Sequence, residues 1–121
     1  MSVAVIVAYA RDNVDKATIG FTLANAALEQ GEPVSIILAS EGVRLAQRGY
    51  VVDFDNGEPF KPMQQLIDEA LQKGAALNVC TPCMKKRHLQ EADIIQHANV
   101  RFIGGADVIR ILKQADRSIQ L

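Results

Sequence analysis

Short, densely apolar runs alternate along this chain with longer stretches in which apolar residues recur at helical spacing. The run at residues 2–8 is continuous and rich in Val and Ile, as is typical of a parallel strand that is buried on both faces. Comparable runs occur at residues 34–39, 76–80 and 100–103, and the chain closes with Ser118-Ile119-Gln120-Leu121. The pattern predicts four buried strands, with residues 118–121 adding an edge strand.

The segments between these strands have the periodicity of helices. Residues 62–73 give the clearest case, because Met63, Leu66, Ile67 and Ala70 place one apolar stripe along the helix. Further helices are predicted over residues 15–30, 40–47 and 106–115, and another is predicted to start around Pro82.

Residues 50–61 are the least regular part of the chain and predict a loop, with a short strand at Val51-Val52. Elsewhere strand and helix alternate, with no internal repeat and no linker. That alternation is typical of a parallel sheet covered by helices on both faces. The sequence therefore predicts one domain over residues 1–121, an α/β fold with three α/β/α layers and a mostly parallel sheet of about five strands.

Composition narrows the kinds of partner and compartment. Hydrophobic residues make up 49% of the chain and aromatic residues only 5%, and the net charge is −1, so nothing points to a nucleic-acid or an anionic membrane partner. The apolar opening is too short to span a bilayer and lacks the basic flank of a secretion signal. The only two cysteines are too close in sequence to form the long-range disulfides of secreted domains. We expect a cytoplasmic protein without membrane association.

Those two cysteines form the sequence Cys80-Thr81-Pro82-Cys83, at the point where a strand gives way to a helix. Thr81 suits the N-cap and Pro82 the first helical position, which places Cys83 in the first turn. The helix amides, together with Lys86 and Arg87, would stabilise a thiolate. The pattern predicts a nucleophilic cysteine with a lowered pKa, Cys80, and an auxiliary thiol, Cys83.

Several chemistries compete for this pair. The cysteines could simply be packing residues, or they could exchange disulfides, although no proline follows the pair as thioredoxin requires. A zinc site would have to draw on Cys80, Cys83, His88 and His97, whose spacing does not match zinc fingers. In persulfide chemistry, one thiol accepts a sulfane sulfur and the second resolves it as a disulfide. The residues alone do not choose between persulfide chemistry and generic thiol redox chemistry.

Other features are weaker. Arg11 and Asn13 follow the first strand and could line a pocket at the sheet edge that bears Cys80. Gly104-Gly105 precedes a helix without the GxGxxG or Walker pattern, and no Ser/His/Asp arrangement is evident. We therefore expect no cofactor, no metal, and no hydrolase or dehydrogenase activity.

The order and spacing of these segments resemble the DsrE/DsrF family. The likeness is carried by Leu77-Asn78-Val79-Cys80, the short helix with Lys86-Arg87, Ile103-Gly104-Gly105-Ala106, and the segment from Glu41 to Ala46. It implies a cytoplasmic α/β/α protein that assembles into homotrimers or homohexamers. In relay members of the family, the cysteine at the position of Cys80 carries a persulfide between donor and acceptor proteins.

Cys83 sets this chain apart from those relay members, which have a small residue at that position. The chain is more similar to a branch of small, little-characterised members with Cys-x-x-Cys. Two hypotheses follow from the sequence. The first is a sulfur-handling or thiol-redox protein acting through Cys80 and Cys83. The second is a non-catalytic oligomeric module that binds a small ligand or metal at the strand ends, in which the cysteines are structural.

Overall fold

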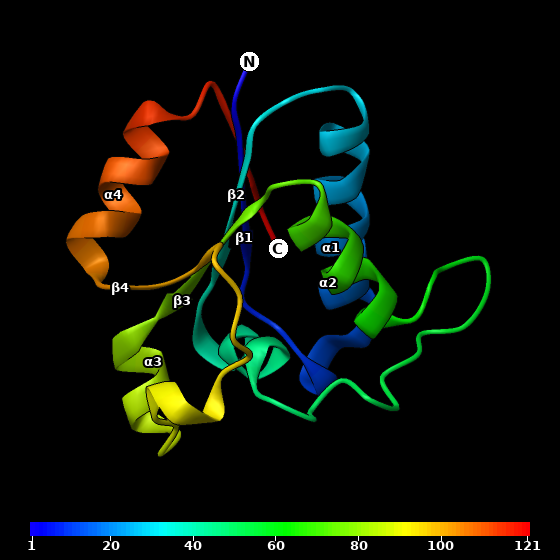
Figure 1. The fold of residues 1–121 in the computed structure, drawn as a ribbon, viewed down its shortest axis with the longest axis vertical. Helices are drawn as coiled ribbons and strands as arrows, with labels where there is room; N and C mark the ends of the chain where they lie inside the picture. Colours follow the sequence, from blue (N-terminus) through cyan, green and yellow to red (C-terminus); the bar gives the residue numbers. More distant parts are fainter.

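A computed structural model describes residues 1–121, and its centre is a five-stranded sheet in the order β4-β3-β2-β1-β5 (Figure 1). The strands are β1 (Val3–Val7), β2 (Val34–Leu38), β3 (Ala76–Cys80), β4 (Val100–Ile103) and β5 (Arg117–Gln120). Every neighbouring pair is parallel. The four apolar runs and the final edge segment thus correspond to the five strands, and the predicted parallel sheet is confirmed.

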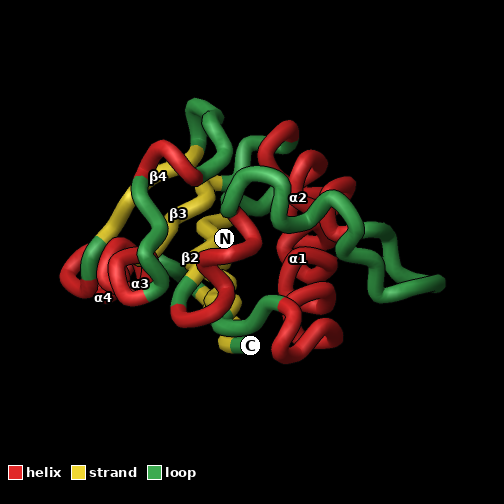
Figure 2. Tube along the Cα trace, turned by 90° about the horizontal axis from the view of Figure 1, so that it is seen from below, coloured by secondary structure: helices red, strands yellow, loops and turns green.

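Helices cover both faces of this sheet, as predicted. Helices α1 (Val14–Glu29) and α2 (Met63–Gln72) pack on one face, and α4 (Gly105–Gln114) lies on the other (Figure 1). Figure 2 shows the same division from below, with the short helix α3 (Thr81–Lys86) on the side of α4. No helix is long and apolar enough to cross a membrane.

The main hydrophobic core lies between the sheet and the α1–α2 layer. Phe21 of α1, Ile36 of β2 and Leu77 of β3 are fully enclosed there. Each such side chain contributes about 1.5–3 kcal/mol through burial. Gly20 brings α1 close to β1, since a Cβ atom at this position would lie 2.7 Å from a methyl group of Val7.

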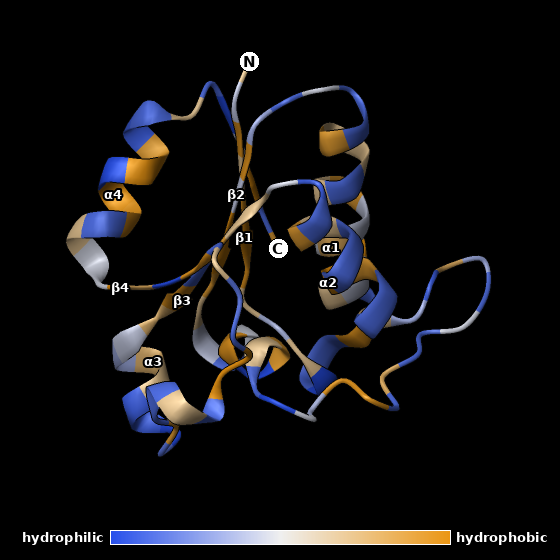
Figure 3. Cartoon of the chain, in the orientation of Figure 1, coloured by the Kyte–Doolittle hydropathy of each residue, from blue (hydrophilic) through white to orange (hydrophobic).

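The opposite face is covered more thinly. Helix α4 is amphipathic, and Figure 3 shows hydrophobic and hydrophilic residues interspersed along it. None of its residues is fully buried, and Ile109 remains 55% exposed. The α4 layer therefore leaves both apolar surface and space beside the sheet.

Two local predictions need correction or refinement. The segment expected as a helix over 40–47 is a 3₁₀ helix, η2 (Ser40–Ala46), which lies close against the end of β1. Val51-Val52 forms turns and no strand. Two further 3₁₀ turns, η1 (Arg11–Asn13) and η3 (Glu91–Asp93), were not predicted.

Candidate functional site

The two cysteines lie at the carboxyl edge of the sheet, where β3 passes directly into α3. Cys80 ends the strand and occupies the cap position, and the helix begins at Thr81. The prediction that Thr81 is the N-cap is therefore wrong. Its hydroxyl instead donates a hydrogen bond to the carbonyl oxygen of Ile103, 3.0 Å away, and so ties the junction to β4.

The sulfur of Cys83 receives a hydrogen bond from a distant part of the chain. The backbone N–H of Ser40 donates to Cys83 Sγ at 3.2 Å. Ser40 adopts a φ of 53°, in the left-handed region that non-glycine residues seldom occupy, and this turn follows β2 directly. The Cys83 sulfur thus accepts a hydrogen bond of the kind that a sulfur anion accepts more strongly than a neutral thiol.

Gly42 explains how Ser40 reaches this position. A Cβ atom on Gly42 would lie 2.1 Å from the carbonyl oxygen of Val7, so only glycine allows η2 to approach the end of β1 so closely. The same carbonyl accepts a hydrogen bond from Ala39 N–H at 3.1 Å. The end of β1 thus fixes the turn that carries the Ser40 amide.

An ion-pair network joins η2 to α3 beside the thiols. Arg87 donates from Nε to Glu41 Oε1 at 2.8 Å and from Nη1 to the carbonyl oxygen of Cys83 at 3.1 Å. The other carboxylate oxygen of Glu41 pairs with Arg44 at 2.8 Å. The hydrogen bond from Arg87, supported by Arg44, holds the pKa of Glu41 below its ordinary value. Lys86, by contrast, is exposed and makes no hydrogen bond or ion pair.

The pKa of Cys80 departs from the prediction. Burial raises it above its ordinary value, and the neighbouring Cys83 thiol adds to the effect. The backbone N–H of Cys83 and the charge of Arg87 act in the opposite direction but do not outweigh burial. The prediction of a lowered pKa at Cys80 is therefore wrong, because the strand end is less hydrated than a solvent-facing helix terminus. Both cysteines are free and half-buried.

Arg11 and Asn13 lie at the carboxyl end of β1 but are engaged elsewhere. Arg11 donates from Nη2 to Asp53 and to the carbonyl oxygen of Tyr50, with its guanidinium 5.0 Å from the Tyr50 ring centre. The side chain of Asn13 caps α1 by accepting from Lys16 N–H at 3.1 Å. Neither residue lines a cavity.

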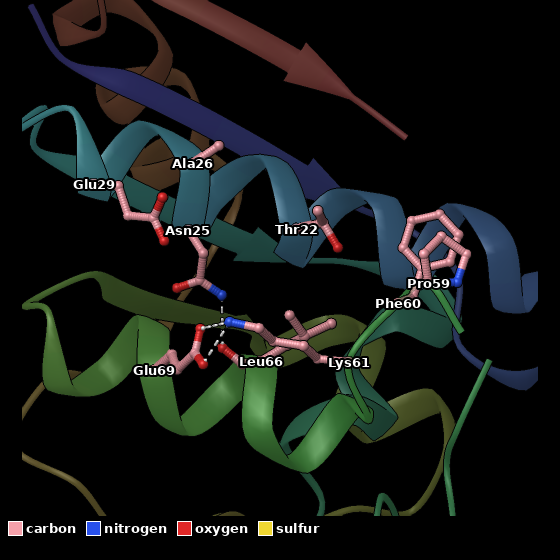
Figure 4. Close-up of a pocket in the computed structure, with 9 residues that line it drawn as sticks. All are labelled: Thr22, Asn25, Ala26, Glu29, Pro59, Phe60, Lys61, Leu66 and Glu69. Atoms are coloured by element: carbon pink, nitrogen blue, oxygen red, sulfur yellow. Dashed lines mark hydrogen bonds and ion pairs between the residues drawn. The ribbon is translucent and has the colours of Figure 1, made fainter. Parts of the chain in front are cut away.

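The cavity drawn in Figure 4 lies between α1, α2 and the loop at residues 59–61, and has a volume of about 210 Å³. Lys61 extends across it to Glu69 at 2.9 Å. The side-chain amide of Asn25 donates to the Leu66 carbonyl, and its Oδ1 is buried without a partner. Neither cysteine lines this cavity.

Nor do the residues considered for zinc form a ligand set. No three His, Cys, Asp or Glu side chains come close enough together to hold a metal ion. Sequence reasoning also missed a second cavity of about 210 Å³, between α4 and the sheet, to which Arg101 contributes. Its one sequence signal is the arginine within the otherwise apolar run at residues 100–103.

The parallel sheet is covered by helices on both faces and carries two cysteines at its carboxyl edge. These features define a small α/β protein with a thiol pair at the strand ends. The chain belongs to the DsrE/DsrF-like family, which it matches over residues 1–121. It is 28% identical to the uncharacterized protein MK0008 of Methanopyrus kandleri over 117 residues, covering 97% of this chain and 91% of that protein. It is 29% identical to the uncharacterized protein MJ0989 of Methanocaldococcus jannaschii, covering 98% of each.

Solved structures show the same fold. The ychN protein from E. coli aligns with a TM-score of 0.82 at 18% identity, over 100% of this chain and 99% of that one. A conserved protein of unknown function from Bacteroides thetaiotaomicron, BT1422, aligns with a TM-score of 0.69 at 17% identity, over 99% and 94% of the two chains. The three-layer architecture is therefore that of known members of this fold.

Proposed function

We propose that this protein accepts a sulfane sulfur at Cys80 as a persulfide and passes it on, with Cys83 as the auxiliary thiol. The observation that carries the proposal is the hydrogen bond from Ser40 N–H to Cys83 Sγ at 3.2 Å, beside the less hydrated Cys80 thiol. Membership of a family associated with sulfur relay supports the same reading. The two sulfurs thus have different surroundings, since Cys83 Sγ accepts a backbone hydrogen bond while burial raises the pKa of the Cys80 thiol. Such a pair suits a step that moves a proton while an S–S bond forms.

The first step uses Cys83 as the base. Its thiolate takes the proton of the Cys80 thiol while Cys80 Sγ attacks the outer sulfur of a donor persulfide, R–S–SH. The donor's S–S bond breaks, RS⁻ leaves, and Cys80 becomes Cys80–S–SH. An acceptor thiolate then attacks the outer sulfur, so that the sulfur moves on and the Cys80 thiolate is restored.

When no acceptor arrives, the pair resolves itself. Cys83, deprotonated again, attacks Cys80 Sγ, a Cys80–Cys83 disulfide forms, and HS⁻ leaves. The sulfane sulfur is reduced to sulfide while the two thiols are oxidised, so no outside oxidant is needed. Two equivalents of an external thiol, RSH, would then reduce the disulfide by thiol–disulfide exchange and leave as RSSR.

The test compares sulfide release from the wild type, Cys83→Ser and Cys80→Ser after loading with inorganic polysulfide at alkaline pH, where Cys80 ionises without Cys83 as its base, and removal of the excess. The wild type should release a stoichiometric amount of sulfide and form the disulfide, whereas Cys83→Ser should retain its sulfur until an acceptor thiol is added. Sulfur retained equally by Cys80→Ser and Cys83→Ser would contradict the assignment of Cys80 as the carrier.

The proposal extends to assembly and surroundings. We propose a homotrimer or homohexamer, as the family resemblance implies, acting in the cytoplasm where thiols stay reduced, with sulfur donor and acceptor proteins as its partners. The exposed Ile109 on the thin α4 layer supports association between copies of the chain, because exposed apolar surface favours burial in an interface.

A further inference from the structure

The α4 face of the sheet holds a cavity that neither cysteine lines. It has a volume of about 210 Å³ and lies between α4 and strands β2, β3 and β4. Its polar lining includes Asn78, Arg101, Arg110, Ser35 and Gln114. A mostly polar lining of this kind is suited to a small, charged molecule rather than to an apolar side chain.

Asn78 forms the floor of the cavity and is incompletely paired. The residue is only 2% exposed, and its Nδ2 donates to the carbonyl oxygen of Ile36 at 3.0 Å. Asn78 lines the cavity, and no group in the chain donates a hydrogen bond to its Oδ1. That oxygen keeps its capacity to accept, so a ligand that brings an N–H or O–H donor can bind to it.

The walls supply positive charge. Arg101 lies opposite Asn78 in the β3–β4 register, and it forms no ion pair. Arg110, on α4, pairs with Asp107 at 2.8 Å. The other nearby carboxylate, Asp116, accepts hydrogen bonds from Ser2 instead. The Arg101 guanidinium is therefore uncompensated, and a carboxylate is the partner that its planar fork of donors suits.

The cavity and the thiol share one face of the sheet. The Cys80–Ile103 pair lies two residues further along β3 and β4 than the Asn78–Arg101 pair, and Ile103 also lines the cavity. Since alternate residues of a strand point to the same face, Asn78 and Cys80 lie roughly 7 Å apart along β3. A molecule of amino-acid size seated on Arg101 and Asn78 would thus point toward Cys80.

We propose that this cavity binds a small carboxylate that also carries an ammonium or other hydrogen-bond donor, the class that includes low-molecular-weight amino-acid thiols. The carboxylate binds Arg101 and Arg110, and the donor binds Asn78 Oδ1. That the bound molecule donates sulfur to Cys80 rests on the proposed function, but binding of the carboxylate to the cavity does not.

The test measures binding without thiol chemistry. A Cys80→Ser/Cys83→Ser protein is titrated with L-cysteine and, separately, with cysteamine, which lacks the carboxylate, while backbone amide shifts are followed by NMR. L-cysteine should give saturable shifts at Asn78, Arg101 and Ile103, and cysteamine should not. Arg101→Gln should weaken L-cysteine binding about tenfold or more, as expected for loss of a charge-assisted hydrogen bond.

Lys113→Gln is the matched control, because Lys113 is exposed on the same helix and does not line the cavity. Equal L-cysteine affinity in the Arg101→Gln and Lys113→Gln proteins would overturn the inference, as would shifts that do not saturate. Polysulfide carries no carboxylate, so it can form a persulfide at Cys80 even if the cavity does not bind L-cysteine. The two proposals are therefore tested separately.

Discussion

Replacing Gly42 by alanine tests whether the contact between η2 and β1 holds the thiol site in place. The added Cβ atom would lie 2.1 Å from the Val7 carbonyl oxygen, 3.0 Å from its carbon and 3.4 Å from Ala8 Cα. These are backbone atoms within and directly after a central strand, so no side-chain rotation can relieve the clash. The η2 segment must move away from β1 instead.

The cost follows from what that movement disturbs. The hydrogen bond from Ala39 N–H to the Val7 carbonyl would be lost, at about 1 kcal/mol, and strained packing of the buried Val43 and Leu45 would add about 1–3 kcal/mol. We expect Gly42→Ala to lower the free energy of unfolding by about 2–4 kcal/mol. Ser40 would move with η2, so the alkylation rate of Cys83 should fall as well.

Urea denaturation followed by circular dichroism measures the change. Gly105→Ala is the matched control, because nothing lies within 4 Å of its added Cβ and Gly105 begins helix α4. That control should be neutral or stabilising by up to about 1 kcal/mol. If Gly42→Ala were as stable as Gly105→Ala, the account of η2 as the element that positions Ser40 would be refuted.

Three further predictions follow from the site. Because the pKa of Glu41 is lowered in the folded state, its carboxylate stabilises the fold at pH values above its ordinary pKa of about 4.5. This contribution is lost as the pH falls through the folded-state pKa. The difference in unfolding free energy between the wild type and Glu41→Gln should therefore become smaller on acidification, as measured by urea denaturation at several pH values. Iodoacetamide should modify Cys83 in the Cys80→Ser protein faster than Cys80 in the Cys83→Ser protein at neutral pH, because burial raises the pKa of Cys80. Equal rates, measured by mass spectrometry, would contradict that shift. Light scattering should give a trimer or hexamer, and Ile109→Asp should shift it toward monomer; an unchanged mass would place the interface elsewhere.

The sheet was predictable because its information is local. Each buried strand is a continuous apolar run, and the helix at residues 62–73 shows a complete apolar stripe. The type of each element and its place along the chain therefore follow from neighbouring residues. The thiol pair was predictable for the same reason, since Cys80 and Cys83 are adjacent to the end of such a run.

The contacts that define the site are not local. The Ser40 amide reaches Cys83 across 43 residues and needs a left-handed turn that serine rarely adopts. The sign of the Cys80 pKa shift depends on burial, which sequence spacing does not report. Arg11 looked free at a strand end but is bound by the loop residues Tyr50 and Asp53, which no periodicity connects to it.

Peptide mass spectrometry of Cys83→Ser protein treated with polysulfide at alkaline pH, where the Cys80 thiol ionises without Cys83 as its base, tests the central claim most directly. The proposal predicts that the peptide containing Cys80 gains the mass of one sulfur atom, and that this mass is lost when an acceptor thiol is added. An unmodified Cys80 in a folded Cys83→Ser protein would contradict the carrier role, and with it the sulfur-handling function proposed for this chain.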